Sequence, residues 1–571
     1  MKLFKLFPML LLSLGLALGS CQSEDDGPDP GGGEGTESGY FSLNFQDLGT
    51  IPTKALVEDP GLEDESNITS IRVILYGAAS GVPEYVKDYT VTSAWNGSSG
   101  SDITGTGLIT GANTETGIKT EAEKILIKNY KLLVLLNPTA EVADLTKVGS
   151  STTFQNFKGT KISTVSNPAP TLTAGEEYKY FTGSAMDNFM MGNFQEFINI
   201  QPKDFYKTTT EAEDNPVDVY VERAVAKVFV SGPDVDDPTN LTNVVLPEGA
   251  SISTPAWKLD ITNKDSYLIR NMTRDNNGDA ERTNPAWSVP NRHRFYAGDV
   301  NMDGISRERY PDPLDPYPGN EDEPNVIFNY FTDVTLVDQE LGTYEYALEN
   351  TMEAEEQYED VTTAVIIGLV YNPGRSAVYG EEFPEGSGRV LTDGEILTGS
   401  GYFVWTYRAG TEFATKYVFT GKDLDQIKAL DLSSDPAIIG AFPEFEALHD
   451  FLNNSESGWD VFVPSGAAFA DYGGGVDSYL DEENMMAYHT PGTNYYRVPI
   501  RHFDDSLQPE PMAWGRFGIV RNNVYKLSLK AVNGPGDITI PEPQGPDDKT
   551  GYLSLEIKVL PWVVRTQDVG V

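Results

Sequence analysis

Residues 39–61, GYFSLNFQDLGTIPTKALVEDPG, combine a strand pattern with a single basic residue. Phe41, Leu43 and Phe45 alternate with polar residues, which is typical of a strand with one apolar face. Proline favours a turn next, and Lys54 follows it as the only basic residue of the stretch. Two interpretations fit this pattern: an ordinary first strand of a domain, or a strand that is removed when the chain is cut after Lys54.

An export signal precedes this strand. Residues 1–20 have a basic start and a short apolar run, which predicts a secretory signal peptide and is too short to favour a membrane span. The run ends in LGSC, and small residues before Cys21 resemble a bacterial lipobox. Such a site is cut before the cysteine and carries lipid with palmitate-type acyl chains on its thiol, which anchors the chain in the outer membrane. The alternative is an ordinary signal peptide with an incidental cysteine.

An acidic tether is predicted for residues 21–39. This stretch is rich in glycine, proline and acid and has no large apolar residue before Tyr40, so it cannot bury enough surface to fold. Cys21 is the only cysteine, so no internal disulfide supports the fold. The acids SEDD directly after it resemble surface-export signals of some Gram-negative lipoproteins.

The bulk composition indicates an exported β protein with more than one domain. The chain has 571 residues and a formal net charge of −45, which disfavours a nucleic-acid partner. Valine-rich and alternating stretches recur between clusters of Gly, Pro, Asn and Asp, with only a few short helical segments. We therefore expect an all-β fold of two β-sandwich domains with long loops, over residues 55–216 and 217–560, divided near the acidic stretch EAEDNPVD.

No catalytic motif stands out in the sequence. The histidines have no zinc-ligand spacing, and no phosphate-binding loop, dinucleotide turn or nucleophile elbow is present. We expect no enzymatic activity and no cofactor. The histidines are His293, His449, His489 and His502.

One stretch resembles the start of a calcium loop. In GDVNMDGISRERY, Asp299, Asn301 and Asp303 stand at alternate positions and a glycine follows, as calcium ligation requires. The twelfth position departs from the pattern, because Tyr310 stands where a bidentate acid belongs. The alternatives are a calcium site and a plain Asx-rich turn.

Several segments, in this order along the chain, resemble a fimbrillin of type V pili, of the kind that forms the major subunit of the minor fimbrium. They are VERAVAKVFV, DNFMMGN, NYYRVPIRHF, GRFGIVRNNVYKLSLKAVNGPG and GYLSLEIKVLPWVVRTQDVGV, together with the lipobox and the early strand. The resemblance implies two sandwich domains of transthyretin-like, Greek-key topology. It also implies lipoprotein export, proteolytic removal of the first strand and polymerisation by donor-strand exchange.

The resemblance assigns roles to both ends of the chain. Residues 40–54 become a removable strand that inserts Phe41, Leu43 and Phe45 into a groove, and the cut falls between Lys54 and Ala55. Residues 561–571 become the donor strand of another copy. Their apolar residues are Trp562, Val563, Val564, Val569 and Val571.

The expected function is that of a structural subunit in a surface fimbria that supports adhesion and colonisation. Its partners are copies of itself, accessory fimbrial subunits and, until the cut, the outer membrane. The alternatives are a tip or anchor subunit of the same fimbria, a glycoside hydrolase with two placed carboxylates, and a surface glycan-binding lipoprotein. The last would use exposed aromatics such as Trp95, Trp257 or Trp287.

Overall fold

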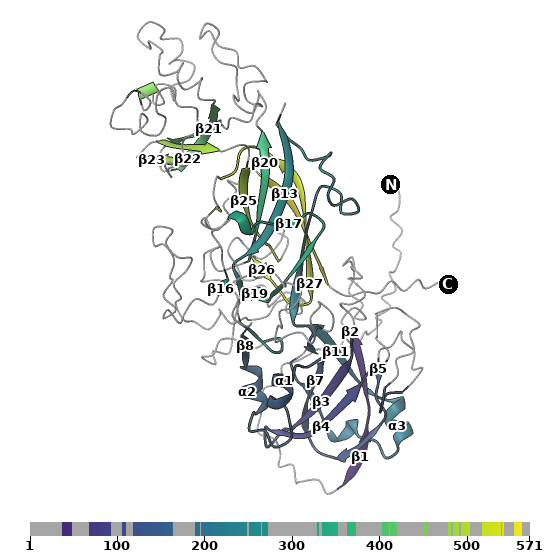
Figure 1. Cartoon of the computed structure of the whole chain (residues 1–571). Helices are drawn as coiled ribbons and strands as arrows, with labels where there is room; N and C mark the ends of the chain where they lie inside the picture. The colour runs from purple at the N-terminus through teal and green to yellow at the C-terminus, as the bar shows by residue number, and fades with distance from the viewer. Residues whose placement is uncertain are drawn as a thin grey trace, which may run out of the picture.

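Strands dominate the described part of this computed structural model (Figure 1). The structure describes residues 37–47, 68–92, 105–109, 118–163, 189–194, 196–247, 250–263, 265–271, 328–329, 334–351, 363–372, 402–409, 412–419, 449–450, 453, 478–480, 484–489, 493–502, 517–537, 540–541 and 553–561.

The predicted all-β class is confirmed. Within the described elements the α-helices are short: α1 (Ala140–Leu145), α2 (Phe154–Lys158) and α3 (Thr209–Asp214). Each starts at a threonine whose side chain accepts a backbone N–H, and α3 has the full capping box of Thr208 and Glu211. No helix in these described ranges is long and apolar enough to cross a membrane.

The N-terminal sheet has eight strands and is drawn in the lower half of Figure 1. In spatial order its strands are β4 (Pro83–Thr90), β3 (Ser70–Gly77), β7 (Tyr130–Leu136), β9 (Met191–Asn193), β11 (Val217–Arg223), β2 (Leu43–Asp47) and β5 (Ile118–Lys119), with β10 (Ile198–Ile200) paired to β7. Beside this sheet, β1 (Ser38–Phe41) pairs with β6 (Glu123–Leu126).

This sheet is buried on both faces. On β7, Leu132, Val134 and Leu136 join the core that contains β1 and β2, whereas Leu133 and Leu135 join a second core with α1 and α2. The continuous apolar run of β7 therefore forms the two-sided buried strand that it predicts.

A β-sandwich follows, formed by two four-stranded sheets. One has the order β18 (Tyr344–Leu348), β12 (Val225–Ser231), β27 (Asn523–Val532) and β28 (Leu553–Pro561). The other has the order β17 (Gln339–Glu340), β13 (Ser251–Asp260), β20 (Ala364–Asn372) and β25 (Thr493–Pro499). Side chains from both sheets meet in one apolar core that includes Val228, Trp257, Ile367 and Leu527.

The remaining described strands form smaller groups. They are β14 (Thr262–Asn263) with β16 (Phe328–Asn329), β15 (Asp265–Tyr267) with β8 (Lys161–Ser163), β19 (Asn350–Thr351) with β26 (Gly518–Ile519), and a four-stranded sheet of β22 (Glu412–Phe419), β21 (Tyr402–Ala409), β24 (Asn484–His489) and β23 (Ser478–Leu480). Single-turn 3₁₀ helices lie in the described ranges at Pro202–Asp204 and Val334–Leu336.

The chain passes from the N-terminal sheet into the sandwich at Ala224. The expected boundary, before Val217, is not where the pairing changes, because β11 still pairs with β2 and β9. The next strand, β12, pairs with β18 and β27. We propose the boundary between Arg223 and Ala224.

Buried ion pairs lie where the two parts meet. Arg270 donates to both carboxylate oxygens of Glu222 on β11, and both side chains are 2% exposed. Arg521 Nε donates to Glu349 at 2.9 Å, and its Nη2 donates to the carbonyl of Tyr267 at 2.9 Å. Forked arginine–carboxylate bonds fix the relative position of the groups that they join. The described residues thus connect β11 and the sandwich through paired buried charges.

Removing one partner of the junction should destabilise the chain strongly. Arg270→Met leaves the Glu222 carboxylate buried without its guanidinium, which should cost about 3–5 kcal/mol of the free energy of unfolding. Urea denaturation measures this loss. The matched control is Lys147→Met, which breaks an exposed pair with Asp144 and should cost less than about 0.5 kcal/mol. Equal effects of the two substitutions would contradict this view of the junction.

A third buried pair, between Glu345 and Lys258, lies within the sandwich and concerns its response to pH. Glu345 on β18 accepts a hydrogen bond from the Leu259 amide at 2.9 Å and lies 3.2 Å from the Lys258 ammonium on β13. Burial nevertheless raises the pKa of Glu345 to about 7, more strongly than Lys258 lowers it. The folded chain therefore keeps this proton at pH values where the unfolded chain loses it.

The contribution of Glu345 to stability should fall as pH rises. It is complete below the ordinary pKa of 4.5 and is lost as pH rises through about 7. The difference in free energy of unfolding between the wild type and Glu345→Gln should change by up to about 3 kcal/mol between about pH 4.5 and about pH 7.5. Urea denaturation at the two pH values checks this. A difference that does not depend on pH would exclude a role for this carboxyl.

Candidate functional site

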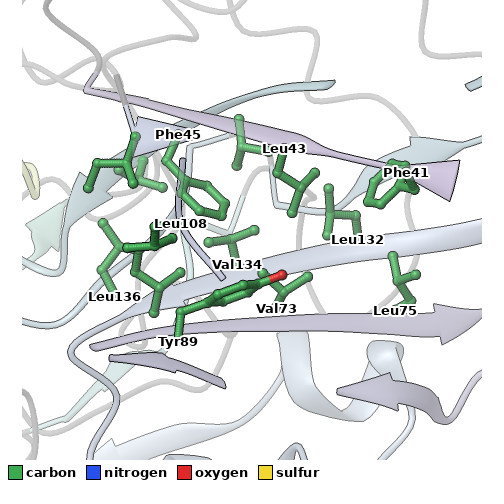
Figure 2. Close-up of a cluster of buried hydrophobic side chains, with 14 of the residues drawn as sticks. Phe41, Leu43, Phe45, Val73, Leu75, Tyr89, Leu108, Leu132, Val134 and Leu136 are labelled. Carbon is green, nitrogen blue, oxygen red and sulfur yellow. The ribbon is translucent and has the colours of Figure 1, made fainter. Parts of the chain in front are cut away.

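The N-terminal strand lies inside its sheet, with its apolar face in the core. Phe41, Leu43 and Phe45 are 3%, 2% and 3% exposed. Figure 2 shows all three pointing from β1 and β2 toward the side chains of β3 and β7, including Val73 and Val134. At about 25 cal/mol per Å² of buried apolar surface, burying each such side chain stabilises the fold by about 1.5–3 kcal/mol.

The backbone of this strand is bonded along both edges. On one side β2 runs parallel to β11, from Leu43 opposite Val217 onward, and the Val217 amide donates to Ser42 O at 3.0 Å. On the other side β2 pairs with β5, and the Thr120 amide donates to Leu43 O at 2.9 Å. Without this strand, β11 and β5 would each have an open edge.

Two polar side chains on neighbouring segments fix the position of the strand. Thr120 Oγ1 accepts from the Leu43 amide at 3.0 Å, and Thr120 O accepts from the Ser42 hydroxyl at 2.8 Å. Asp218 accepts from the Asn44 side-chain amide at 2.7 Å. The face of the strand that the sequence predicts to be polar is therefore hydrogen-bonded and buried, since Ser42 is 2% and Asn44 is 4% exposed.

An aromatic group covers the first part of the strand. The ring of Phe41 lies 5.6 Å from that of Phe205, which lies 6.2 Å from that of Tyr130. Burial raises the pKa of Tyr130 to about 12, so its hydroxyl stays neutral and donates to Leu126 O at 3.0 Å. Tyr40 and Tyr206 exchange backbone hydrogen bonds of 2.8 and 2.9 Å.

Whereas β2 lies inside its sheet, the last described strand, β28, lies at the edge of its sheet. It pairs antiparallel with β27, from Asn523 opposite Pro561 to Val532 opposite Leu553. It is the last strand in the order of its sheet, so within the described part of the chain it is an edge strand. Edge strands present unpaired backbone groups to any further strand.

Most of the other predicted site residues lie outside the described residues. The structure therefore does not test the lipidation of Cys21, the cut between Lys54 and Ala55, or the donor strand. The same holds for the calcium interpretation. The residues concerned are Trp562, Val563, Val564, Val569 and Val571 for the donor strand, and Asp299, Asn301 and Asp303 for calcium. Among described side chains, no group of acids, histidines or cysteines is arranged to hold a metal ion.

Sequence reasoning missed Thr120 and Asp218. Thr120 lies 77 positions from Leu43, and Asp218 lies 174 positions from Asn44, so no local pattern connects them to the strand. Trp257 gives no support to the glycan-binding alternative, because it is 0% exposed and donates from its indole nitrogen to Glu340 O at 3.0 Å.

The C-terminal part of the chain matches a known family. Residues 487–568 match the family model described as "Major fimbrial subunit protein type IV, Fimbrillin, C-terminal". This part of the chain is therefore similar to the C-terminal part of a fimbrillin. The match spans β25 to β28 and includes the C-terminal segments that carry the resemblance, namely NYYRVPIRHF, GRFGIVRNNVYKLSLKAVNGPG and most of GYLSLEIKVLPWVVRTQDVGV, and it confirms the resemblance there. Because it is a match to a structural fimbrial subunit, it agrees with the expectation of no catalysis.

Solved structures of fimbrial and cell adhesion proteins align over most of the chain at low similarity. A fimbrilin (fimA) from Porphyromonas gingivalis W83 is 14% identical, covers 92% of this chain and 98% of its own, and has a TM-score of 0.37. The tip fimbrial protein Mfa3 from Porphyromonas gingivalis is 11% identical, with 92% and 100% covered and a TM-score of 0.32. A proposed cell adhesion protein from Parabacteroides distasonis is 11% identical, with 92% and 98% covered and a TM-score of 0.38. No curated protein sequence matches the chain.

The apolar face of the strand should matter only while the strand is present. Phe45→Ala removes a buried ring and should lower the free energy of unfolding of the untrimmed chain by about 3–5 kcal/mol. The exposed Ser38→Ala is the control, and urea denaturation is the measurement. Chain that has been trimmed after Lys54 and has lost the strand no longer contains Phe45, so the effect should be confined to the untrimmed chain. Unchanged stability of the untrimmed variant would contradict the packing described here.

Proposed function

We propose that this protein is a structural subunit of a surface fimbria that is exported as a lipoprotein, trimmed and polymerised by strand exchange. The observation that carries the proposal is the position of β1 and β2: β2 is bonded along both edges, and the two strands together place Phe41, Leu43 and Phe45 in the core. The family match to a major fimbrial subunit supports the fimbrial context.

The order of features along the chain supports a single processing step. Cys21 comes first, then the acidic tether, then β1 and β2, then Lys54 in the segment that leads to β3. A cut after Lys54 separates the folded part from the lipid and from the strand at once. Before the cut, the strand covers the edges of β11 and β5 and so prevents premature pairing with other chains.

After the cut, the strand is held only by non-covalent contacts. When it leaves, a groove opens between β11 and β5, and a C-terminal strand of a second copy fills it. Backbone hydrogen bonds then supply affinity, and alternating side chains set the register. A subunit with both a groove and a donor strand extends a fibre in two directions, as a shaft requires. A tip subunit would need no donor strand, and an anchor would keep its lipid.

The cleavage site gives the direct test. Lys54→Gln should abolish fibres and leave full-length lipidated protein in the outer membrane, whereas wild-type fibres should start at Ala55. N-terminal sequencing of surface fibres and detergent-resistant ladders on gels measure both. The control is Lys147→Gln, which changes an exposed lysine elsewhere and should leave assembly intact. Wild-type fibres that start at Cys21 would contradict the proposal.

A further inference from the structure

Two segments at opposite ends of the chain have similar sequences. Residues 39–48 read GYFSLNFQDL and residues 551–560 read GYLSLEIKVL. Five of the ten positions are identical: the glycine, the tyrosine, the serine and two leucines. At the three positions that face the N-terminal core, Leu553, Leu555 and Ile557 correspond to the apolar residues of β1 and β2.

The two segments occupy different positions. The first forms β1 and β2, and β2 has a neighbour on each side, β11 and β5. The second contains most of β28, which has one neighbour, β27, in the described part of its sheet. A strand that moves from an edge into a groove exchanges one row of backbone hydrogen bonds for two, which favours the move.

We propose that residues 551–560 of a second copy, rather than residues 561–571, fill the groove. This inference rests on the proposed function. The register follows the sequence match: Leu553 takes the place of Phe41, Leu555 that of Leu43, and Ile557 that of Phe45. Because the two segments match in the same direction, the incoming strand runs parallel to β11, as β2 does.

Close packing around Gly39 explains why the matching segments both start with glycine. A Cβ atom on Gly39 would lie 3.0 Å from Phe205 Cβ and 3.2 Å from Ile127 Cδ1, so this position accepts only glycine without movement of its neighbours. Gly551 supplies glycine at the corresponding position of the donor. Ser554 likewise corresponds to Ser42, whose hydroxyl donates to Thr120 O at 2.8 Å.

The segment from Trp562 onward does not meet the apolar requirement. The groove needs three apolar side chains at alternate positions. Starting from Val563, the alternate positions include Arg565 and Gln567, and starting from Trp562 they include Thr566 and Asp568. Burial of such polar or charged side chains in an apolar core is costly. Residues 553–559 instead have four apolar side chains in alternation.

One substitution in the match is unfavourable. Glu556 corresponds to Asn44, whose amide donates to Asp218 at 2.7 Å, so the exchange replaces a hydrogen bond by two like charges. Lys558, which corresponds to Gln46, stands two residues further along the same face of the strand. Its long side chain is within diagonal reach of the Asp218 carboxylate and offsets part of this repulsion. In the proposed register Glu556 of one copy lies opposite Asp218 of the next, so a cross-link between these two positions reports the register.

A disulfide between copies tests this register. Asp218→Cys combined with Glu556→Cys places the two thiols at a cross-strand position where Cα atoms are close enough for a disulfide. Trimmed protein contains no other cysteine, because Cys21 precedes the cut. After assembly and mild oxidation, the double variant should give a covalent ladder that a reductant dissolves. Digestion should then give a peptide in which one chain's position 218 is linked to another's position 556.

The matched control is Asp218→Cys with Asp568→Cys, which marks the rival segment and should give no covalent ladder. A ladder from this control alone, or detergent-resistant fibres with no disulfide in either variant, would overturn the register and leave the fibre proposal standing. Trimmed, cysteine-free protein that stays monomeric would overturn the proposed function itself, and the register with it.

Discussion

The N-terminal sheet depends on one strand that is held along both edges. β2 completes the hydrogen bonding of β11 and β5, and together with β1 it supplies three buried side chains to the core between them. Its only covalent connection to the rest of the sheet is the segment between Asp47 and Ile68, and that segment contains Lys54. A cut in this segment therefore breaks the covalent attachment of the strand without changing its hydrogen bonds or its packing. Strand exchange requires this property, because one strand must be able to leave and another to take its place.

The N-terminal sheet is joined to the sandwich by a continuous strand segment and by buried ion pairs. β11 continues through Ala224 into β12, so the strand that borders β2 is directly continuous with the sandwich. The buried pair of Glu222 with Arg270 spans this junction, and the pair of Glu349 with Arg521 lies on its sandwich side. In the proposed fibre, this connection joins one subunit's groove to its own C-terminal strand.

Local patterns were sufficient for part of this fold. The alternation of Phe41, Leu43 and Phe45 predicts which face of the strand is buried, and the apolar run of β7 predicts burial on both faces. Alternation alone did not show that β11 and β12 belong to different sheets, because the apolar pattern runs through Ala224 without a turn residue. The capping box at Thr208 and Glu211 was a local indication of α3 that the strand-dominated interpretation passed over.

Long-range partners had no local pattern at all. Thr120 and Asp218 form hydrogen bonds to the strand, and Arg270 and Arg521 form buried ion pairs near the junction. In the sequence, the segments around these four residues resemble ordinary polar surface. Their roles come from topology that brings distant segments together. The near repeat of residues 39–48 and 551–560 is readable in the sequence, but its meaning depends on knowing that one copy is internal and the other is an edge strand.

Hydrogen exchange at the edges of β11 and β5 tests the central claim most directly. The backbone amides that face the strand, those of residues 217, 219 and 221 on β11 and of 118 and 120 on the side of β5, are compared in the untrimmed chain, the trimmed monomer and the fibre. The account predicts slow exchange in the untrimmed chain, fast exchange in the trimmed monomer and slow exchange again in the fibre. Equally slow exchange in the trimmed monomer would show that the strand stays in place after the cut and would contradict the account.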